Sequence, residues 1–587
     1  MKNKIKTEWN FKLFYKSDKD PQIEKDFKTF EKAVIAFEKK YKNSTKYTTD
    51  ATELLKACKD YERLIAMPEG EKPTIYFMIR RDVDANNKFV NAKVNELSER
   101  LNKISNKMIF FGLKLGKIEK SYQDQFLKEK SLLRFHYFLK KTFENSKHEL
   151  TEPEERIINL LNLPAHSMWV DGFSKVLNNQ EIEFKGKKIS LNEASGMCMN
   201  ANTKDRRELS DLIYKKMFSV SDFCEAEINA IVSGKKISDE LRGFAKPYSE
   251  TIYNYGNEDK TIESLVDVVT KNFKISHRFY KIKAKLIGEK KLFYADKIAK
   301  VGNLKTKFTY EESIKIVHSA FAKFDQKYAD IFEKYIQEGR IDVFPKKGKR
   351  GGAYCLATPF VPNLVFLNHT DNFSSVSTIG HEMGHSIHTE LSKKQPPLYA
   401  NYPISIAEVA STFFENFVFD EVYENLSEKE KIIALHNKID NSVATIFRQV
   451  ACFNFEKELH ETIRKSGYCS KEDMAKIMKK HMQSYLGPVF EMKDIDGYNY
   501  VSWIHIRNFF YVYAYAFGGL ISDSLYAEYK KDKKFKDKIE QFLKAGGSKS
   551  PEDIFADIGI NIRDPKFFEN GLKAIEEDIK RLEKLVK

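Results

Sequence analysis

The chain is poor in cysteine, with six in 587 residues, and no two of them form a Cys-x-x-Cys pair. Their spacing gives no sign of a disulfide framework, which favours free thiols in a reducing compartment. The first residues are charged and lack the apolar stretch of a secretory signal peptide. The longest apolar run, residues 509–521, is shorter than the roughly 20 residues that a membrane helix needs. These absences predict a cytoplasmic protein without a membrane segment.

Motifs typical of nucleotide or nucleic-acid binding are also missing. The chain has no zinc-finger spacing, no phosphate-binding loop and no RNP-like aromatic motif. The formal net charge is +15, and a basic balance can indicate binding to nucleic acid or to a membrane surface. Because acidic residues are interleaved with the lysines, solvated lysine faces are the preferred interpretation, and no nucleic-acid partner is predicted. A nucleic-acid binder remains an alternative, and it would show a salt-steep affinity.

A length of 587 residues predicts two or more lobes, or one large helical body. Helical periodicity recurs along most of the chain, and residues 181–189 read as a short hairpin. From residue 340 a Gly-rich basic turn leads to an apolar strand at 364–368, which together predict a small sheet. The edge of that sheet could bind an extended peptide by strand addition, or the pair could be a structural hairpin.

One segment, residues 374–390, carries an unusual concentration of histidine. Residues 381–385 read His-Glu-Met-Gly-His, a match to the His-Glu-x-x-His pattern. On a helix, His381 and His385 lie one turn apart on the same face, so both imidazoles can reach one metal ion. Glu382 can then approach a water molecule at the metal without taking a ligand position. The alternative is a core helix with hydrogen-bonded histidines, but burying these groups without a metal or a network is costly.

The next predicted helix, residues 403–421, offers a third ligand. It carries Glu408 and Glu415 in an otherwise apolar segment, where ionised carboxylates are seldom buried unpaired. Glu408 is the predicted ligand because the 23 residues that separate it from His385 leave room for a loop and a returning helix. His388 is a rival, but three ligands in line on one helix suit tetrahedral geometry poorly, so we expect a supporting or substrate-facing role. Glu415 could hydrogen-bond a ligand histidine or pair with a basic residue.

An aromatic segment, residues 498–517, is predicted as one helix. Such a helix is usually part of a core, but this one has more tyrosine than phenylalanine. Buried tyrosine hydroxyls need partners, and the oxyanion of a transition state is one such partner. His505, Tyr511 and Tyr513 are therefore candidate catalytic residues.

Several segments in this order resemble oligoendopeptidase F, one of the thimet-oligopeptidase-like zinc metallopeptidases. The similarity runs from about residue 120 to the end and is weakest in the first hundred residues. The segments that carry it are residues 351–355, 381–388, 407–412, 510–517 and 545–548.

The resemblance implies a mostly α-helical, elongated, zincin-like body with a deep substrate channel and a small sheet beside the active-site helix. It implies one Zn²⁺ per chain, held by His381, His385 and Glu408, with Glu382 as the general base. It also implies endopeptidase cleavage of short oligopeptides. We expect an N-terminal helical region over residues 1–190 and the zinc peptidase region over 191–587. The alternative is a non-catalytic peptide-binding helical protein with a structural metal. The sequence makes no prediction of oligomeric state.

Overall fold

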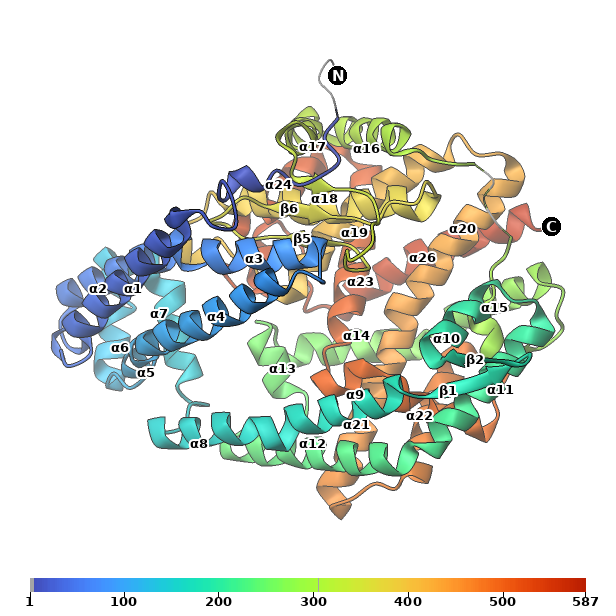
Figure 1. Ribbon diagram of the computed structural model, residues 1–587, viewed down its shortest axis with the longest axis horizontal. Helices are drawn as coiled ribbons and strands as arrows, with labels where there is room; N and C mark the ends of the chain where they lie inside the picture. The colour runs from blue at the N-terminus through green and yellow to red at the C-terminus, as the bar shows by residue number, and fades with distance from the viewer. Residues whose placement is uncertain (1–4, 303, 305) are drawn as a thin grey trace.

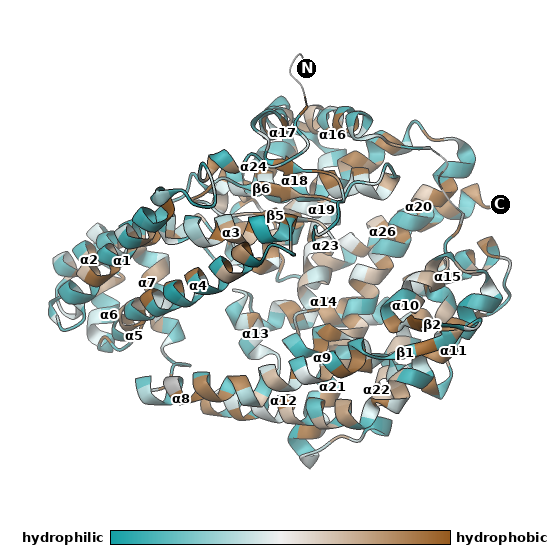
Figure 2. Ribbon diagram, in the orientation of Figure 1, coloured by the Kyte–Doolittle hydropathy of each residue, from teal (hydrophilic) through white to brown (hydrophobic). Residues whose placement is uncertain are grey.

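The computed structural model describes residues 5–302, 304 and 306–587, without the side chain of residue 156, and it is mostly α-helical, as predicted. The helices form an elongated body (Figure 1). Surface helices such as α4 and α12 mix hydrophilic and hydrophobic residues, as amphipathic helices do (Figure 2). None of the described helices is both long and apolar enough to cross a lipid bilayer.

The first helices form an amino-terminal lobe with its own hydrophobic cluster, which runs from Trp9 to Phe143. Its helices are α1 (Pro21–Tyr41), α2 (Ala51–Ile65), α3 (Lys72–Val83), α4 (Lys88–Ser105), α5 (Ile109–Gly116), α6 (Lys120–Phe126) and α7 (His136–Asn145). A second and larger cluster holds most of the buried apolar residues from Phe173 onward. The division of the chain at residue 190 stays a prediction.

The remaining helices build the larger body, and two of them, α18 and α19, carry the predicted metal ligands. They are α8 (Glu152–Asn162), α9 (Met168–Asn178), α10 (Leu191–Asn200), α11 (Thr203–Ser219), α12 (Ser221–Leu241), α13 (Ser249–Asn254), α14 (Asp259–Lys271), α15 (Lys274–Leu286), α16 (Tyr310–Phe324), α17 (Gln326–Glu338), α18 (Phe373–Ser392), α19 (Ile404–Tyr423), α20 (Glu428–Ser442), α21 (Arg448–Ser466), α22 (Lys471–Leu486), α23 (Tyr513–Lys531), α24 (Lys536–Ala545), α25 (Pro551–Asp557) and α26 (Pro565–Leu585).

The strands are short and, within the described residues, form three small sheets. The predicted hairpin is present as the antiparallel pair β1 (Glu181–Phe184) and β2 (Lys187–Ser190). A parallel pair joins β3 (Leu292–Phe293) to β7 (Phe490–Glu491). The predicted sheet before the histidine helix is also present, with the order β4-β6-β5 and β5 at one edge. Its strands are β4 (Ile341–Asp342), β5 (Tyr354–Leu356) and β6 (Leu364–Phe366).

Strand β6 belongs to both hydrophobic clusters. Its side chains alternate, so that Val365 packs in the larger cluster while Leu364 and Phe366 pack in the amino-terminal one. The indole N–H of Trp9 lies within hydrogen-bonding distance of two carbonyl oxygens, 2.9 Å from that of Val365 and 3.0 Å from that of Arg340. The sheet therefore ties the start of the chain to the middle of the larger body.

The prediction of one aromatic helix over residues 498–517 is wrong for residues 498–512. Residues 494–502 and 504–508 form 3₁₀ turns, and α23 begins only at Tyr513. The cause is the backbone of Phe509 and Phe510, whose φ angles of 37° and 61° interrupt a right-handed helix. Side-chain periodicity could not reveal this break.

Helices α18 and α19 cross closely because α18 presents glycine to α19. A Cβ on Gly384 would lie 2.6 Å from the Cα of Ser411 and 2.9 Å from the carbonyl oxygen of Ala410. A Cβ on Gly380 would lie 2.7 Å from a methyl carbon of Val418. These glycines let the two helices approach until side chains of α18 and Glu408 of α19 meet.

Replacing Gly384 by alanine is expected to destabilise the protein by about 1–3 kcal/mol, because the methyl group forces backbone against backbone. Thermal unfolding of the variant will show the effect as a lower Tm. Gly112→Ala is the matched control, since a Cβ there has no neighbour within 4 Å and alanine favours the helix. A Gly384→Ala protein as stable as Gly112→Ala would contradict the packing described here.

Candidate active site

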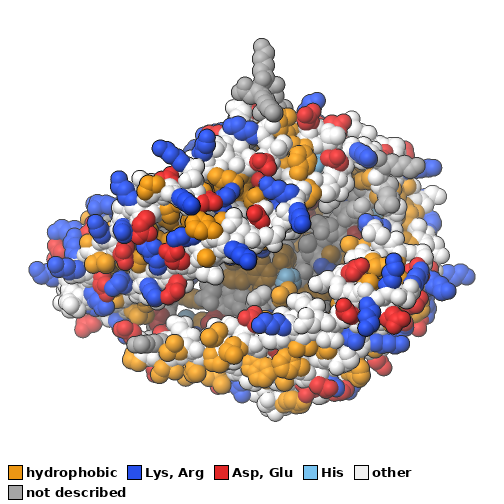
Figure 3. Space-filling model, viewed as in Figure 1, with side chains coloured by type: hydrophobic (Ala, Val, Ile, Leu, Met, Phe, Trp, Pro, Cys, Tyr) orange, Lys and Arg blue, Asp and Glu red, His pale blue; other side chains and the backbone are white. Residues whose placement is uncertain are grey.

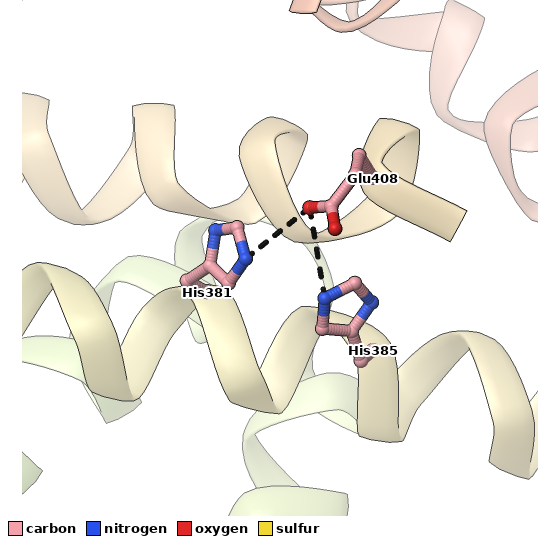
Figure 4. Close-up of side chains that lie close together, drawn as sticks. All are labelled: His381, His385 and Glu408. Atoms are coloured by element: carbon pink, nitrogen blue, oxygen red, sulfur yellow. Dashed lines mark ion pairs between the residues drawn. The ribbon is translucent and has the colours of Figure 1, made fainter. Parts of the chain in front are cut away.

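Three side chains from two helices converge between α18 and α19 (Figure 4). His381 and His385 project from α18, and Glu408 projects from α19 toward both of them (Figure 4). The Nε2 atom of His381 lies 3.3 Å from Oε2 of Glu408, and that of His385 lies 3.7 Å from the same oxygen. Among the described residues, these three form the one group of histidine, cysteine or acidic side chains spaced to hold a metal ion. His381, His385 and Glu408 are called the metal-type group below.

Each histidine is oriented by a second partner behind the group. Nδ1 of His381 lies 3.3 Å from Oε2 of Glu415, one of the two roles considered for that carboxylate from the sequence. The backbone carbonyl of Ala407 accepts a hydrogen bond from His385. Both imidazoles therefore keep Nε2 directed to the common point, the arrangement by which metal-binding histidines are usually held.

The electrostatics of the group follow from burial and from the two carboxylates. Burial favours neutral His381, but Glu408 and Glu415 outweigh it and raise the pKa of His381 well above its usual value. Burial and then the charge of His381 lower the pKa of His385 to about 4. Burial opposes ionisation of Glu408, yet the hydrogen bond from His381 and the neighbouring charges lower its pKa to about 2. Glu408 is thus an ionised carboxylate at neutral pH.

Glu382 lies beside this group without joining it. Its side chain is 7% exposed, and burial raises the pKa of Glu382 to about 7 against the opposing charge of His381. The backbone of Cys355, on the edge strand β5, hydrogen-bonds the carboxylate. The same strand meets α18 through Cys355, whose Sγ lies 3.2 Å from Oγ of Ser386. A carboxyl group with a pKa close to neutrality can both accept and return a proton.

His388 does not face the group formed by the other two histidines. It is fully buried, its ring stacks on Tyr402 at 3.7 Å between centroids, and both its nitrogens lack a hydrogen-bond partner among the described residues. Burial lowers the pKa of His388 to about 3, so the ring is neutral. The structure therefore supports neither the rival-ligand role nor the substrate-facing role for His388.

The structure separates the three catalytic candidates of the aromatic segment. His505 and Tyr511 are partly exposed, with ring centroids 5.9 Å apart, and the charge of Glu408 reaches Tyr511. Tyr513 is fully buried, and its hydroxyl donates to Oδ1 of Asn257 at 3.1 Å. Tyr515 was not a candidate from the sequence. Its ring centroid lies 5.7 Å from that of His505 and 5.2 Å from that of Tyr511. Spacing by four residues from Tyr511 was the signal that could have identified it.

Phe509 and Phe510, which precede Tyr511 and have positive φ angles, are each held by a hydrogen bond to another part of the chain. The backbone N–H of Phe510 donates to Oε2 of Glu456 at 2.5 Å, and the carbonyl of Phe509 accepts from Oγ1 of Thr251 at 2.9 Å. Glu456 is fully buried, and its other oxygen has no partner among the described residues. Burial raises the pKa of Glu456 to about 8.

This raised pKa predicts a pH-dependent stability. Between about pH 4.3, where an unfolded glutamate titrates, and about 8, the folded protein keeps a proton that the unfolded chain releases, so this residue makes unfolding easier as pH rises. Glu456→Gln cannot ionise and keeps a carbonyl acceptor for Phe510. We expect the Tm of Glu456→Gln to equal that of the wild type at pH 5 and to exceed it at pH 8. Glu461→Gln, on the exposed side of α21, is the control and should show no such pH-dependent difference. A Tm difference between Glu456→Gln and the wild type that is the same at both pH values would contradict the raised pKa of Glu456.

A cavity of about 720 Å³ lies beside Glu415, the carboxylate that contacts Nδ1 of His381. It is lined by Glu415 of α19, Thr445 between α20 and α21, and Gly519 of α23. In the space-filling view, the face of the molecule is hollowed between α3 and α4 on one side and α8 and α12 on the other (Figure 3). Ligands of the size of a peptide segment therefore have room beside the candidate site.

Comparison with known proteins identifies the family. The family model described as Peptidase family M3 matches residues 197–574, which is more than half of the chain. The chain belongs to peptidase family M3. A second family model, described as Oligopeptidase F, matches residues 114–184. The resemblance to oligoendopeptidase F is confirmed, and this M3 protein is a metalloendopeptidase.

Individual relatives of this M3 peptidase agree with that assignment. Oligopeptidase PepF of Bacillus subtilis is 25% identical over 531 residues, covering 87% of this chain and 78% of its own. A crystal structure from Chlamydophila abortus, described only as a candidate peptidase, has a TM-score of 0.87 at 21% identity and covers 99% and 98% of the two chains. The crystal structure of oligoendopeptidase-F from Enterococcus faecium has a TM-score of 0.70 at 18% identity, and the match covers 96% of this chain and 99% of that one. The two structures show that the fold is shared.

Proposed function

We propose that this M3 peptidase is a zinc-dependent endopeptidase that hydrolyses internal bonds of short oligopeptides. The observation that carries the proposal is the convergence of two imidazole nitrogens and one ionised carboxylate oxygen, with a second carboxyl group of near-neutral pKa beside them. The names of the relatives, oligopeptidase and oligoendopeptidase, support oligopeptides as the substrate class.

The residues present fit zinc. Nitrogen and oxygen ligands about 2.0–2.1 Å from a tetrahedral ion lie about 3.3 Å from one another, close to the 3.3 and 3.7 Å that separate the ligand atoms here. His381, His385 and Glu408 would hold the ion and leave one position open, which is typical of catalytic rather than structural sites. When bound, zinc supplies a Lewis acid that polarises a carbonyl group and makes water more acidic.

Glu382 would act as the general base and then as the general acid. It accepts a proton from the attacking water and returns that proton to the nitrogen of the departing amine, so it ends the cycle as it began. Burial suits it to this role, because its pKa of about 7 lies near the pH at which a peptidase in the cell would work.

The tetrahedral intermediate of peptide hydrolysis carries a negative oxygen that needs hydrogen-bond donors. Tyr511 and His505 are proposed for this role because both are partly exposed, the charge of Glu408 reaches Tyr511, and the two rings lie 5.9 Å apart. Tyr515 is the addition that the structure suggests. Tyr513 is left out because Asn257 already occupies its hydroxyl.

The edge strand β5 would align the substrate. It has one ladder partner, β6, and it contacts Glu382 through the backbone of Cys355. A peptide added along the open edge would gain main-chain hydrogen bonds that do not depend on its side chains. This arrangement suits an enzyme that accepts many peptide sequences.

The deciding experiment combines metal analysis of the purified protein with cleavage of an internally quenched fluorescent peptide. We expect one zinc per chain, loss of cleavage with a chelator, and recovery when zinc is added back. Bound zinc without cleavage of any oligopeptide would favour the alternative, a peptide-binding protein with a structural metal. Full activity in metal-free protein would contradict the proposed mechanism.

A further inference from the structure

Two buried carboxylates hold the segment that carries His505 and Tyr511. The segment lies between α22 and α23, and residues 494–502 and 504–508 of it form 3₁₀ turns. Glu227 of α12 and Glu456 of α21 reach the segment from neighbouring helices, and both side chains are fully buried. A functional group on an irregular segment depends on such outside contacts for its position.

Glu227 acts on the turn around His505 through Arg507. The guanidinium of Arg507 is buried and donates to both carboxylate oxygens of Glu227, at 2.8 and 2.7 Å. The same guanidinium donates to three backbone carbonyl oxygens at 3.1–3.4 Å, and these belong to Tyr500, Val501 and Trp503. His505 lies between Trp503 and Arg507 in the chain, so the ion pair closes the turn that carries His505.

Glu456 acts on the turn before Tyr511. Its Oε2 accepts a hydrogen bond from the backbone N–H of Phe510 at 2.5 Å, and Oγ1 of Thr251 donates to the carbonyl of Phe509 at 2.9 Å. Positive φ angles in two consecutive phenylalanines are costly, and they persist only where the surrounding structure over-determines them. These contacts therefore fix the direction in which the chain enters Tyr511.

Stability does not account for either carboxylate. A buried ion pair such as Glu227–Arg507 is often no more stable than apolar residues of similar size. Glu456 has one oxygen without a partner among the described residues, which costs free energy in a buried position. What both carboxylates do is select one backbone conformation, and strained backbone of this kind is typical of functional sites.

We propose that Glu227 and Glu456 are positioning residues of the active site, an inference that rests on the proposed peptidase function. Glu227 sets the place of His505 through Arg507, and Glu456 sets the place of Tyr511 through the backbone of the preceding residue. Because both carboxylates are fully buried, they act without touching the substrate. They keep the two candidate donors together, with ring centroids 5.9 Å apart. Donors to an oxyanion must be held where its charge develops, so a small displacement slows the reaction.

The first test measures kcat and KM of the holoenzyme on a quenched fluorescent peptide. Glu456→Leu removes the acceptor and should lower kcat by about 10–100-fold with little change in KM, part of the 10²–10³-fold that an oxyanion donor supplies. Glu456→Gln keeps a carbonyl acceptor and should retain most of kcat. In a Tyr511→Phe enzyme, Glu456→Leu should cause no further loss, because it acts through that hydroxyl. Glu461→Leu, on the exposed side of α21, is the control.

Thr251→Val gives a second route to the same answer if Glu456→Leu does not fold. It removes the hydrogen bond to the carbonyl of Phe509 and keeps nearly the same side-chain shape. We expect a smaller loss of kcat than in Glu456→Leu, and this loss should also disappear in a Tyr511→Phe enzyme.

Glu227 is tested by replacing the ion pair as a unit. Glu227→Leu/Arg507→Met exchanges both charges for apolar side chains, so neither charge is left buried alone and we expect the fold to survive. The value of kcat should fall by about tenfold or more, and a His505→Ala enzyme should show no further loss. Glu99→Leu/Lys103→Met exchanges an exposed ion pair of α4 and is the control.

Losses that multiply with those of Tyr511→Phe or His505→Ala would overturn the proposal, since a residue with a purely structural role lowers kcat in every background. Wild-type kcat in Glu456→Leu and in Glu227→Leu/Arg507→Met would overturn it as well, and so would wild-type kcat in Tyr511→Phe and His505→Ala. A wild-type enzyme that cleaves no oligopeptide would instead refute the proposed peptidase function.

Discussion

Replacing Glu382 by glutamine will lower kcat by about 10²–10⁴-fold and leave the bound metal in place. The amide keeps the size of the side chain but cannot accept a proton from water, and general base catalysis is worth about that factor. Because Glu382 lies outside the group of His381, His385 and Glu408, its loss removes no ligand. Cleavage of a quenched peptide and the zinc content should be measured on the same preparation.

The control for this variant is Glu424→Gln, an exposed carboxylate at the end of α19 that should change neither quantity. Glu382→Asp adds a second test, since it keeps the carboxylate but withdraws it by one methylene, so we expect partial activity. A Glu382→Gln enzyme with near wild-type kcat would remove Glu382 from the mechanism. Loss of zinc from that variant would show that Glu382 is a ligand.

Removing the carboxylate of Glu408 is expected to have the second large effect, on metal affinity rather than on proton transfer. Glu415→Gln should lower the zinc affinity by about 10–100-fold, the loss that is typical when a hydrogen-bond partner of a ligand histidine is removed. Glu408→Gln should lower the zinc affinity further. The reason is that the Glu408 oxygen faces both Nε2 atoms, whereas Glu415 contacts only Nδ1 of His381. Competition with a chromogenic chelator measures both constants.

The order of the two losses makes this prediction specific. If Glu415→Gln lost more affinity than Glu408→Gln, the ion would sit between His381 and Glu415, and the ligand set proposed here would be incorrect. Equal and small losses in both variants would indicate that the histidines bind the metal without either carboxylate. Glu424→Gln again provides the reference value.

Much of the metal-type group could be predicted from the sequence because helix periodicity is a local property. Spacing by four residues places His381 and His385 on one face, and a carboxylate in an apolar helix, such as Glu408, has few explanations other than a ligand or an ion pair. The small sheet could be read from the Gly-rich turn and the apolar strand. In each case a short stretch of residues contains the relevant information.

The parts that could not be predicted depend on contacts between distant segments. The hydroxyl of Tyr513 is satisfied by Asn257, which is 256 residues away. The reading of residues 498–517 as one helix failed because Phe509 and Phe510 adopt left-handed φ angles that Glu456 and Thr251 hold in place. Periodicity describes which face of a helix is apolar, and it does not identify the partner.

The shared strand β6 also constrains the order in which the protein can form during synthesis. The amino-terminal lobe contains residues from Trp9 to Phe143, but its cluster is closed by Leu364 and Phe366. At about 5–20 residues per second, a ribosome needs roughly 10 to 40 seconds to add the chain between them. Throughout that interval the nascent lobe exposes the apolar surface that β6 later covers. Chaperones that bind exposed apolar surface on emerging chains would therefore find their target in this lobe.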